Sequence, residues 1–248
     1  MKLLVDSGNS RLKWACIDQG KMASQQSADG GAALTQSTLD SIWGKFDPAP
    51  RQIWIANVAG KGVAELMNRW IGVRWQICPN FVSSQAVAHG VTNGYREPCK
   101  LGVDRWLALV GACHLRLLPA CIVDCGTALT LDVLDRRGNH LGGLISPGLM
   151  LMARSLGKGT AEVRFDTIPD TLDSVLADET VTAVGSGICH SAAGMIERVV
   201  NRLMVQRPDL HLVLTGGDAA TISGMLAFES IVVPDLVLRG LAEVSRRP

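Results

Sequence analysis

The sequence predicts a mixed α/β protein built from two copies of one structural unit, and a repeat along the chain is the main evidence. An apolar run at residues 3–5 ends at Asp6 and is followed by Ser7-Gly8-Asn9-Ser10. A second apolar run at residues 121–123 ends at Asp124 and is followed by Cys125-Gly126-Thr127-Ala128. The same offset of 118 residues aligns segment 17–21 with segment 135–139, each with a glycine at its turn. Strand-like and helix-like patterns then alternate in both halves, so two duplicated domains are expected.

The first half begins with two strands over residues 2–18, joined by the turn after Asp6. A further strand is expected at 52–58, after a connection that contains Pro48 and Pro50. Apolar spacing over 30–46 and 63–70 indicates helices, and another helix is expected to start near Val103 and to continue through Leu115.

The second half repeats this plan. Strands are expected at 120–124, 129–134 and 141–145, with helices over 148–156 and 171–177. A long helix near 181–204, a strand at 210–214 and a last helix at 236–246 complete the chain. The boundary is placed in the helix leading to Pro119, which predicts an N-terminal domain of residues 1–118 and a C-terminal domain of residues 119–248.

Composition excludes several classes of function. The 24 lysines and arginines nearly balance 23 acidic residues, so the net charge of +1 argues against binding to nucleic acid or to a membrane surface. Seven scattered cysteines without a C-x-x-C pair favour reduced thiols over disulfides or a zinc site. The N-terminal apolar run is too short for a signal peptide, and no run reaches the roughly 18–20 residues of a membrane span. A soluble cytoplasmic protein is expected.

The two Asp-x-Gly turns have the residues of phosphate-binding loops. A glycine lets the backbone approach a ligand, and successive amide groups in such a turn form a concavity that suits phosphate oxygens. Asn9, Ser10 and Lys13 add side-chain donors, whereas Asp6 would repel phosphate unless a cation bridged the two. One copy alone would favour a turn that only shapes a hairpin; the second copy favours a pair of loops that hold a polyphosphate.

A third glycine turn, Thr215-Gly216-Gly217-Asp218, follows the apolar run at 210–214. Gly216 and Gly217 have no side chain that would keep a ring or a ribose away from the backbone. An ordinary turn from strand to helix, with Asp218 as N-cap, explains this segment equally well. Other nucleotide-binding patterns are missing, since neither G-x-x-x-x-G-K-[ST] nor G-x-G-x-x-G after the first strand occurs.

Between the two repeats, segment 94–106 contains the strongest candidates for catalytic and substrate-binding side chains. Asp104 falls in the first turn of the helix expected from Val103, beside Arg105. Asp104 is either a helix-start carboxylate with Arg105 in a surface ion pair, or an acceptor for the proton of a substrate hydroxyl with Arg105 holding a substrate anion. The helix terminus and Arg105 both favour the charged carboxylate, which makes Asp104 a weak base that orients the hydroxyl and takes its proton late.

Together these motifs resemble type III pantothenate kinase over nearly the whole chain and in the family's order. The residues that carry the resemblance are Asp6-Ser7-Gly8-Asn9-Ser10, Tyr95 with Leu101-Gly102-Val103-Asp104-Arg105-Trp106, Asp124-Cys125-Gly126-Thr127-Ala128, Gly142-Gly143-Leu144-Ile145-Ser146-Pro147-Gly148, Thr215-Gly216-Gly217-Asp218 and Pro234-Asp235-Leu236-Val237-Leu238-Arg239-Gly240-Leu241. The resemblance implies a duplicated ribonuclease-H-like fold of the actin-like ATPase group, with two domains around an ATP cleft, and a homodimer.

The resemblance also implies phosphorylation of the primary hydroxyl of pantothenate by ATP, the first step of coenzyme A synthesis. It implies Mg²⁺, which Asp6 would help to bind, and a monovalent cation, K⁺ or NH₄⁺, with Asp124 as its ligand. Asp104 resembles the general base. The implied ATP-binding residues are Asp6, Ser7, Gly8, Asn9, Ser10, Arg11, Leu12, Lys13, Thr127, Gly216 and Gly217. The implied pantothenate-binding residues are Tyr95, Gly102, Val103, Asp104, Arg105 and Thr180.

Two positions depart from the family pattern: Glu179 stands where the family has asparagine before Thr180, and Glu97 stands in the loop that presents Tyr95. Two other functions remain open at this point. One is a nucleotide-dependent regulatory protein, such as a transcriptional accessory factor, on the same fold. The other is a sugar or acyl-phosphate kinase with a different acceptor pocket.

Overall fold

The computed structural model describes residues 1–159 and 175–246. The chain separates into two compact units, which are described one at a time. Unit 1 comprises Met1–Leu115 and Asp235–Pro248, and unit 2 comprises Arg116–Pro234. The expected boundary at residues 118 and 119 lies close to the first of these divisions. The C-terminal helix, which was expected in the second domain, packs with unit 1.

Unit 1 is built on a sheet with the strand order β3-β2-β1-β5-β6, and β4 also pairs with β2. Its strands are β1 (Lys2–Ser7), β2 (Arg11–Asp18), β3 (Lys21–Met22), β4 (Gln26–Asp29), β5 (Gln52–Asn57) and β6 (Asn80–Phe81). Its helices are α1 (Gln36–Trp43), α2 (Lys61–Trp75), α3 (Val103–His114) and α7 (Leu236–Val244). A small hairpin of β7 (Val87–Ala88) and β8 (Val91–Thr92) precedes α3.

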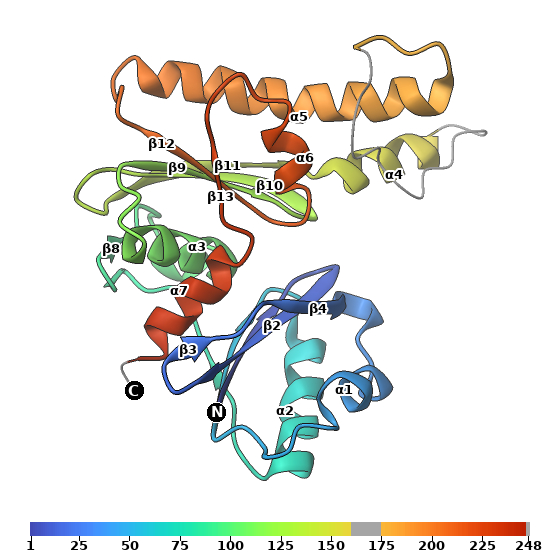
Figure 1. Cartoon of the computed structure of the whole chain (residues 1–248), viewed down its shortest axis with the longest axis vertical. Helices are drawn as coiled ribbons and strands as arrows, with labels where there is room; N and C mark the ends of the chain where they lie inside the picture. Colours follow the sequence, from blue (N-terminus) through green and yellow to red (C-terminus); the bar gives the residue numbers. More distant parts are fainter. Residues whose placement is uncertain (160–174, 247–248) are drawn as a thin grey trace. The chain divides into compact units, whose positions relative to one another are not determined.

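Alternation along the strands gives the sheet of unit 1 two apolar faces. Leu3 and Val5 point to one face, where α1 and α2 cover them, and α3 and α7 lie on the other side (Figure 1). The core under α1 and α2 is aromatic: the rings of Trp43, Trp70 and Trp75 pack together, with Trp14 edge-on to Trp43 at 6.0 Å. Trp14, Trp43 and Trp70 are buried in this core, and Trp75 packs against it.

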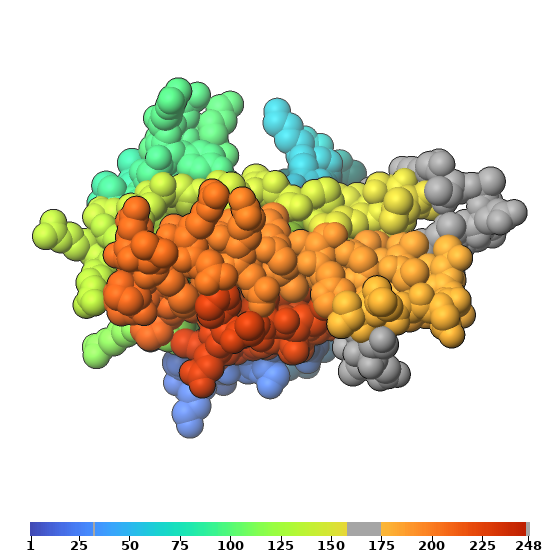
Figure 2. Space-filling model, turned by 90° about the horizontal axis from the view of Figure 1, so that it is seen from above, coloured from blue at the N-terminus to red at the C-terminus, as the bar shows by residue number. Residues whose placement is uncertain are grey.

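Unit 2 has a sheet with the order β11-β10-β9-β12-β13. Its strands are β9 (Ala120–Cys125), β10 (Ala128–Leu134), β11 (His140–Pro147), β12 (His211–Thr215) and β13 (Ile231–Val232). The helices α4 (Leu149–Gly159), α5 (Thr180–Met204) and α6 (Ala219–Ser223) cover one face of this sheet. The surface of α4 runs beside that of α5, seen as yellow beside orange in Figure 2.

The strand pairing confirms the duplication inferred from the repeat. β1 pairs antiparallel with β2 and parallel with β5, and β9 pairs antiparallel with β10 and parallel with β12. Asp6 therefore lies opposite Lys13 on one side, and Asp124 lies between Thr130 and Thr215. Both carboxylates occupy the same position in the same sheet topology, at the carboxyl end of the strand.

Two helices of unit 1, α3 and α7, cross through a reciprocal glycine contact. A Cβ atom on Gly111 would lie 2.5 Å from the carbonyl oxygen of Leu236, and one on Gly240 would lie 1.9 Å from that of Leu107. Each glycine stands four residues after the leucine whose carbonyl the other glycine meets. The backbones of α3 and α7 can approach this closely only because both positions lack a side chain.

Most predicted elements are confirmed, with differences at edges and turns. The expected helix at 30–46 is a short 3₁₀ turn, Gly31–Ala33, followed by α1, because Gly30 and Gly31 interrupt the pattern. The short strands β3, β4, β6 and β13 were not predicted. The expected helix at 171–177 falls mainly outside the described residues, and 175–177 are not helical. Within the described ranges, no helix is both long enough and apolar enough to cross a bilayer.

A Gly→Ala substitution in the crossing of α3 and α7 should affect stability in the opposite direction to one at an open helix position. Gly240→Ala should lower the free energy of unfolding by about 1–3 kcal/mol, because its Cβ meets the backbone of Leu107. Gly72→Ala, in α2, should raise it by about 0.5–1 kcal/mol, because nothing lies near its Cβ and alanine favours the helix. Urea denaturation measures both; equal effects would contradict a tight crossing.

Candidate active site

The first Asp-x-Gly turn, in unit 1, is held by backbone hydrogen bonds. The Gly8 amide donates to the carbonyl of Arg11 at 3.0 Å, which closes the turn between β1 and β2. Asp6 is only 8% exposed and lies directly across from Lys13, so a carboxylate and an ammonium-bearing side chain share one face of the sheet. Asn9, Ser10 and Arg11 are exposed at the tip. Amide groups and polar side chains therefore surround this turn.

Ser7 and Leu12 contribute to this turn in a different way. They are cross-strand partners, and both side chains are buried on the core side of the sheet. Only their backbone atoms can reach a ligand at the turn. Two supporting residues, Gly30 and Gly31, pack on the tip of this turn and were not predicted from the sequence. The Gly30 amide donates to the carbonyl of Ser10 at 3.0 Å. A Cβ on Gly31 would overlap the carbonyl oxygen of Asn9. The Gly-Gly pair in the sequence was the available signal.

The second Asp-x-Gly turn, in unit 2, is closed in a similar way. The Gly126 amide donates to the carbonyl of Ala128 at 3.2 Å, and the Gly148 amide donates to the carbonyl of Thr127 at 3.0 Å. A Cβ on Gly148 would lie 2.1 Å from the carbonyl oxygen of Gly126, so the start of α4 touches the turn. Thr127 is exposed at the tip, where its hydroxyl can meet a ligand.

Asp124 and Gly216 come together because β9 and β12 run parallel, which brings their carboxyl ends to one edge of the sheet. A Cβ on Gly216, whose φ is +96°, would lie 2.5 Å from Oδ1 of Asp124. The Asp218 amide donates to the carbonyl of Cys125 at 3.0 Å and fixes the two turns side by side. Burial, with the negative charges of Asp124 and Asp218, raises the pKa of the Cys125 thiol, so this cysteine stays protonated near neutral pH.

A second cluster in unit 1 forms at the start of α3. The guanidinium of Arg105 donates from Nη1 to the Tyr95 hydroxyl at 2.7 Å and lies 5.5 Å from the centre of the Tyr95 ring. Arg105 is 7% exposed, although it is charged. Asp104 Oδ1 accepts the backbone amide of Arg105 at 2.8 Å, and a Cβ on Gly102 would lie 2.6 Å from the same oxygen. The structure brings together Tyr95, Gly102, Asp104 and Arg105, here called the acceptor cluster.

Asn93 holds the loop that carries Tyr95, and sequence reasoning missed it. Its side chain is 8% exposed; Nδ2 donates to the carbonyls of Gln85 at 3.2 Å and Pro98 at 3.0 Å, and Oδ1 accepts the Tyr95 amide at 3.0 Å. One side chain therefore ties both ends of the loop to the strand region before it. The Asn-Gly pair at 93–94 was a visible turn signal, but the sequence could not show that the side chain is buried.

The other predicted residues are placed separately. Val103 is buried in the first turn of α3, and Thr180 is the first residue of α5, in unit 2. Glu179, the departure before Thr180, lies at the N-cap of α5 and accepts the Thr182 hydroxyl at 2.5 Å. Glu97 is exposed. In the described part of the chain, no three His, Cys, Asp or Glu side chains gather as a metal site.

Comparison with known proteins matches the sequence of this chain to one family. The family model described as type III pantothenate kinase matches residues 2–202. A type III pantothenate kinase of Nitrosococcus oceani is 42% identical over 99% of this chain and 94% of its own length, and one of Burkholderia mallei is 38% identical over 99% of both. The chain belongs to the type III pantothenate kinase family. It is therefore an enzyme, a kinase.

Solved structures show that this kinase has the fold of actin-like ATPases and sugar kinases. The activator of the 2-hydroxyisocaproyl-CoA dehydratase from Clostridium difficile, solved with ADPNP, covers 98% of this chain and 91% of its own, with a TM-score of 0.56 at 14% identity. MreB 5 of Spiroplasma citri, solved with AMPPNP, covers 99% and 95% with a TM-score of 0.55 at 10% identity. The predicted fold class is confirmed. Use of ATP agrees with membership of the kinase family.

The hydrogen bonds of Asn93 predict a specific effect on the acceptor cluster. Asn93→Ala should free the loop of Tyr95, because buried carbonyls and an amide lose their partner at a cost of about 1–3 kcal/mol per group. Tyr95 is the only tyrosine, so ¹⁹F NMR of the protein labelled with 3-fluorotyrosine reports on it alone. The resonance should move towards that of an unfolded chain. Asn68→Ala, at an exposed position of α2, should leave it in place. An unmoved resonance in Asn93→Ala would contradict this role.

Proposed function

We propose that this kinase transfers the γ-phosphoryl group of ATP to the primary hydroxyl of pantothenate, the first step of coenzyme A synthesis. The observation that carries the proposal is the acceptor cluster, in which a buried arginine, a tyrosine hydroxyl and a carboxylate meet at the start of α3. Membership of the family supplies the identity of the acceptor, and the cluster supplies groups of the right chemistry to bind it.

Each residue of the acceptor cluster has a different role in this proposal. Arg105, held in place by Tyr95, presents a guanidinium that can bind the carboxylate of pantothenate through two parallel hydrogen bonds. Asp104 would accept a hydrogen bond from the acceptor hydroxyl, orient its oxygen and take its proton late in the reaction. Phosphoryl transfer passes through a loose transition state, so positioning and charge neutralisation matter more than a strong base. Gly102 leaves room for the Asp104 carboxylate.

The two Asp-x-Gly turns would each bind ATP phosphates. The amides at the tip of the first turn, with Asn9, Ser10 and Lys13, suit anionic oxygens, as do Thr127 and the turn at Gly126 in unit 2. The backbone at Gly216 and Gly217 would lie against the nucleoside, since no side chain stands there. In this proposal Arg11 contributes from the exposed tip, whereas Ser7 and Leu12 contribute only through their backbone.

The residues present fit two kinds of cation. Asp6, a mostly buried carboxylate beside a phosphate-binding turn, suits Mg²⁺, which proteins often bind through one or two carboxylates together with substrate phosphates. Asp124, beside the backbone of Cys125 and Gly216, offers oxygen ligands to K⁺ or NH₄⁺. These cations would neutralise the charge that develops on the transferred phosphoryl group.

A homodimer is also proposed, and it is supported by apolar side chains exposed on unit 2. β11 is an edge strand, and its Leu144 and Ile145 are 45% and 64% exposed. Leu151 and Leu156 on α4 and Val181 on α5 are also more than two-fifths exposed. A second copy would remove this surface from water. A cytoplasmic location is proposed as well, because none of the seven cysteines, all of which are described, forms a disulfide.

Two alternatives differ from this proposal in the acceptor. A regulatory protein on the same fold would hydrolyse or bind ATP without phosphorylating a small molecule, and a sugar or acyl-phosphate kinase would use another hydroxyl or a carboxylate. A regulatory protein has little need for a buried arginine paired with Tyr95 beside Asp104, and a sugar or acyl-phosphate kinase would need a different acceptor pocket. An assay with ATP and a panel of acceptors separates all three, because only the proposed enzyme forms 4'-phosphopantothenate.

In that assay, Asp104→Asn should lower turnover of pantothenate by about 10²–10⁴-fold. The affinities for AMPPNP and pantothenate, measured by calorimetry, should change little, because asparagine keeps the size and one oxygen of aspartate. The matched control is Asp47→Asn, an exposed aspartate of unit 1, which should keep full turnover. Near-normal turnover in Asp104→Asn would contradict the role of this residue in the reaction. In the unmodified enzyme, ATP hydrolysis without any phosphorylated acceptor would favour the regulatory protein.

A further inference from the structure

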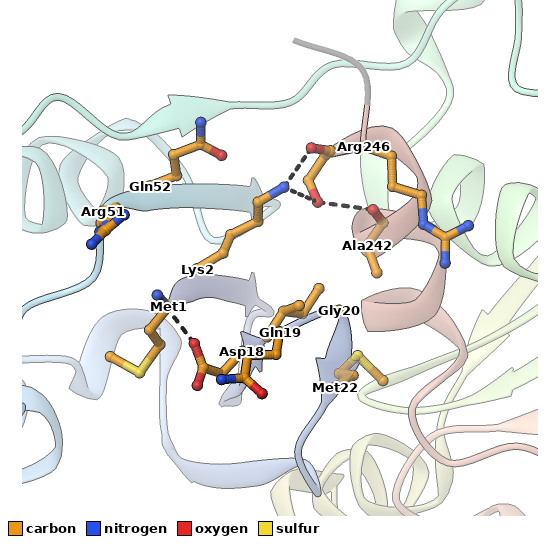
Figure 3. Close-up of a pocket in the computed structure, with 12 residues that line it drawn as sticks. Met1, Lys2, Asp18, Gln19, Gly20, Met22, Arg51, Gln52, Ala242 and Arg246 are labelled. Carbon is orange, nitrogen blue, oxygen red and sulfur yellow. Dashed lines mark hydrogen bonds and ion pairs between the residues drawn. The ribbon is translucent and has the colours of Figure 1, made fainter.

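Unit 1 has a hollow, away from the acceptor cluster, with a volume of about 530 Å³. It lies between the start of β1, the turn from β2 to β3, the start of β5 and the end of α7 (Figure 3). Pockets of about 300–1,000 Å³ hold small molecules in many proteins. Lys2 runs through its centre, with Arg51 and Arg246 on opposite sides (Figure 3).

Unit 2 has a hollow of about 320 Å³ at the equivalent place in its own sheet. The turn from β10 to β11 borders it, as the turn from β2 to β3 borders the hollow of unit 1, and the two turns are related by the 118-residue offset. A hollow at this end of the sheet is therefore a property of the duplicated fold. What distinguishes the two hollows is the side chains that line them.

The lining of the unit 2 hollow is closer to balanced in charge, with Asp135 and Asp209 against three arginines, Arg136, Arg137 and Arg207. Arg136 lies 2.6 Å from Asp209 in an ion pair. Asp135 accepts hydrogen bonds from the amides of Arg137 and Asn139 and from the Asn139 side chain. Partial burial opposes ionisation of Asp135, but the hydrogen bonds from Asn139 and Arg137 outweigh it and lower its pKa. Both carboxylates of this hollow are thus engaged with groups of the same hollow.

The lining of the unit 1 hollow carries an excess of positive charge. Lys2, Arg51 and Arg246 line it together with a single carboxylate, Asp18, which lies 3.4 Å from the amino group of Met1. Arg246 is 3.1 Å from Glu243, which also contacts His114. Lys2 donates to two oxygens of Ser245, at 2.5 and 3.1 Å, and these oxygens are uncharged. The pKa of Lys2 is lowered mainly by burial and, to a smaller extent, by the positive charge of Arg246. An anion bound nearby would offset the effect of Arg246.

Apolar groups complete the hollow of unit 1. Met1, Ile17, Met22 and Ala242 line it, together with the aliphatic stem of Lys2. From these observations we infer that the unit 1 hollow is a binding site for a small organic anion, in which Lys2, Arg51 and Arg246 meet a phosphate or carboxylate group and the apolar side chains contact its aliphatic part.

This site is distinct from those that bind ATP and the acceptor. Lys2 and Asp6 stand at opposite ends of β1, roughly 13 Å apart at the usual rise of a strand. Asp104 and His114 stand at opposite ends of α3, about 15 Å apart at the usual helical rise, and His114 is the end that faces Glu243 of α7 at 3.2 Å. A ligand here would contact β1 and α7 without reaching the phosphate-binding turn.

The test uses the full chain with a saturating concentration of AMPPNP, so that the two Asp-x-Gly turns proposed to bind phosphate are already occupied. Isothermal titration with hexyl phosphate and with hexanoate probes the two anionic groups, and hexanol is the neutral control. The site predicts a Kd of about 1 mM or tighter for at least one of the two anions, as expected of a ligand with so few atoms, and no measurable binding of hexanol. Comparing the two anions distinguishes a phosphate ligand from a carboxylate ligand.

Variants locate the binding. Arg51→Gln combined with Arg246→Gln should weaken binding of the anion at least about tenfold, because both arginines form charge-assisted hydrogen bonds. Lys2→Gln, which can still donate to Ser245, should weaken it as well. Arg69→Gln, on the exposed face of α2, and Arg137→Gln, in the unit 2 hollow, should not change it. Equal affinity in the double variant, binding of hexanol as tight as that of the anions, or no saturable binding up to about 10 mM would each overturn the proposal.

Discussion

The crossing of α3 and α7 is the contact on which the acceptor cluster depends. Gly111 and Gly240 let the two backbones touch, and residues of α3 are buried over most of its length as a result. A helix held this firmly can present Asp104 and Arg105 from its first turn, and Tyr95 holds the Arg105 guanidinium in addition. The same crossing explains why the C-terminal helix belongs to unit 1, although it follows unit 2 in sequence. Its partner, α3, lies in unit 1.

The duplication provides two equivalent turns, and the side chains around them have diverged. In unit 1 the carboxylate Asp6 faces Lys13 across the strand pair; in unit 2 Asp124 lies between two threonines and beside the backbone of Gly216. An ammonium next to the first carboxylate suits phosphate, while the oxygen-rich surroundings of the second suit a cation. The hollows at the other ends of the two sheets have also diverged: three arginines face two carboxylates in unit 2, whereas Lys2, Arg51 and Arg246 face one carboxylate in unit 1. Equivalent backbones thus carry side chains suited to different ligands.

Much of this could be predicted from the sequence, because the signals are local. The Asp-x-Gly repeat fixed the positions of β1, β2, β9 and β10, and the helix start at Val103 placed Asp104 correctly. Long-range packing could not be predicted: the pairing of α7 with α3 and the burial of Ser7 and Leu12 on the core side depend on segments distant along the chain. The three hydrogen bonds of Asn93 are local, but the sequence does not show that this side chain is buried against them. Short edge strands were missed because two-residue strands such as β3 have too little alternation to detect.

The central claim is that unit 2 binds the nucleoside part of ATP through the turn at Gly216 while unit 1 binds the acceptor at the start of α3. The most direct measurement is the affinity for AMPPNP and for pantothenate, by calorimetry, of Gly216→Ala, with Gly224→Ala as a control whose Cβ meets only ordinary contacts. The Cβ at residue 216 would displace the Asp124 carboxylate and the Cys125 carbonyl. AMPPNP affinity is expected to fall at least about tenfold, with pantothenate affinity unchanged within about twofold. An equal loss of both affinities, or an unchanged affinity for AMPPNP, would contradict the account.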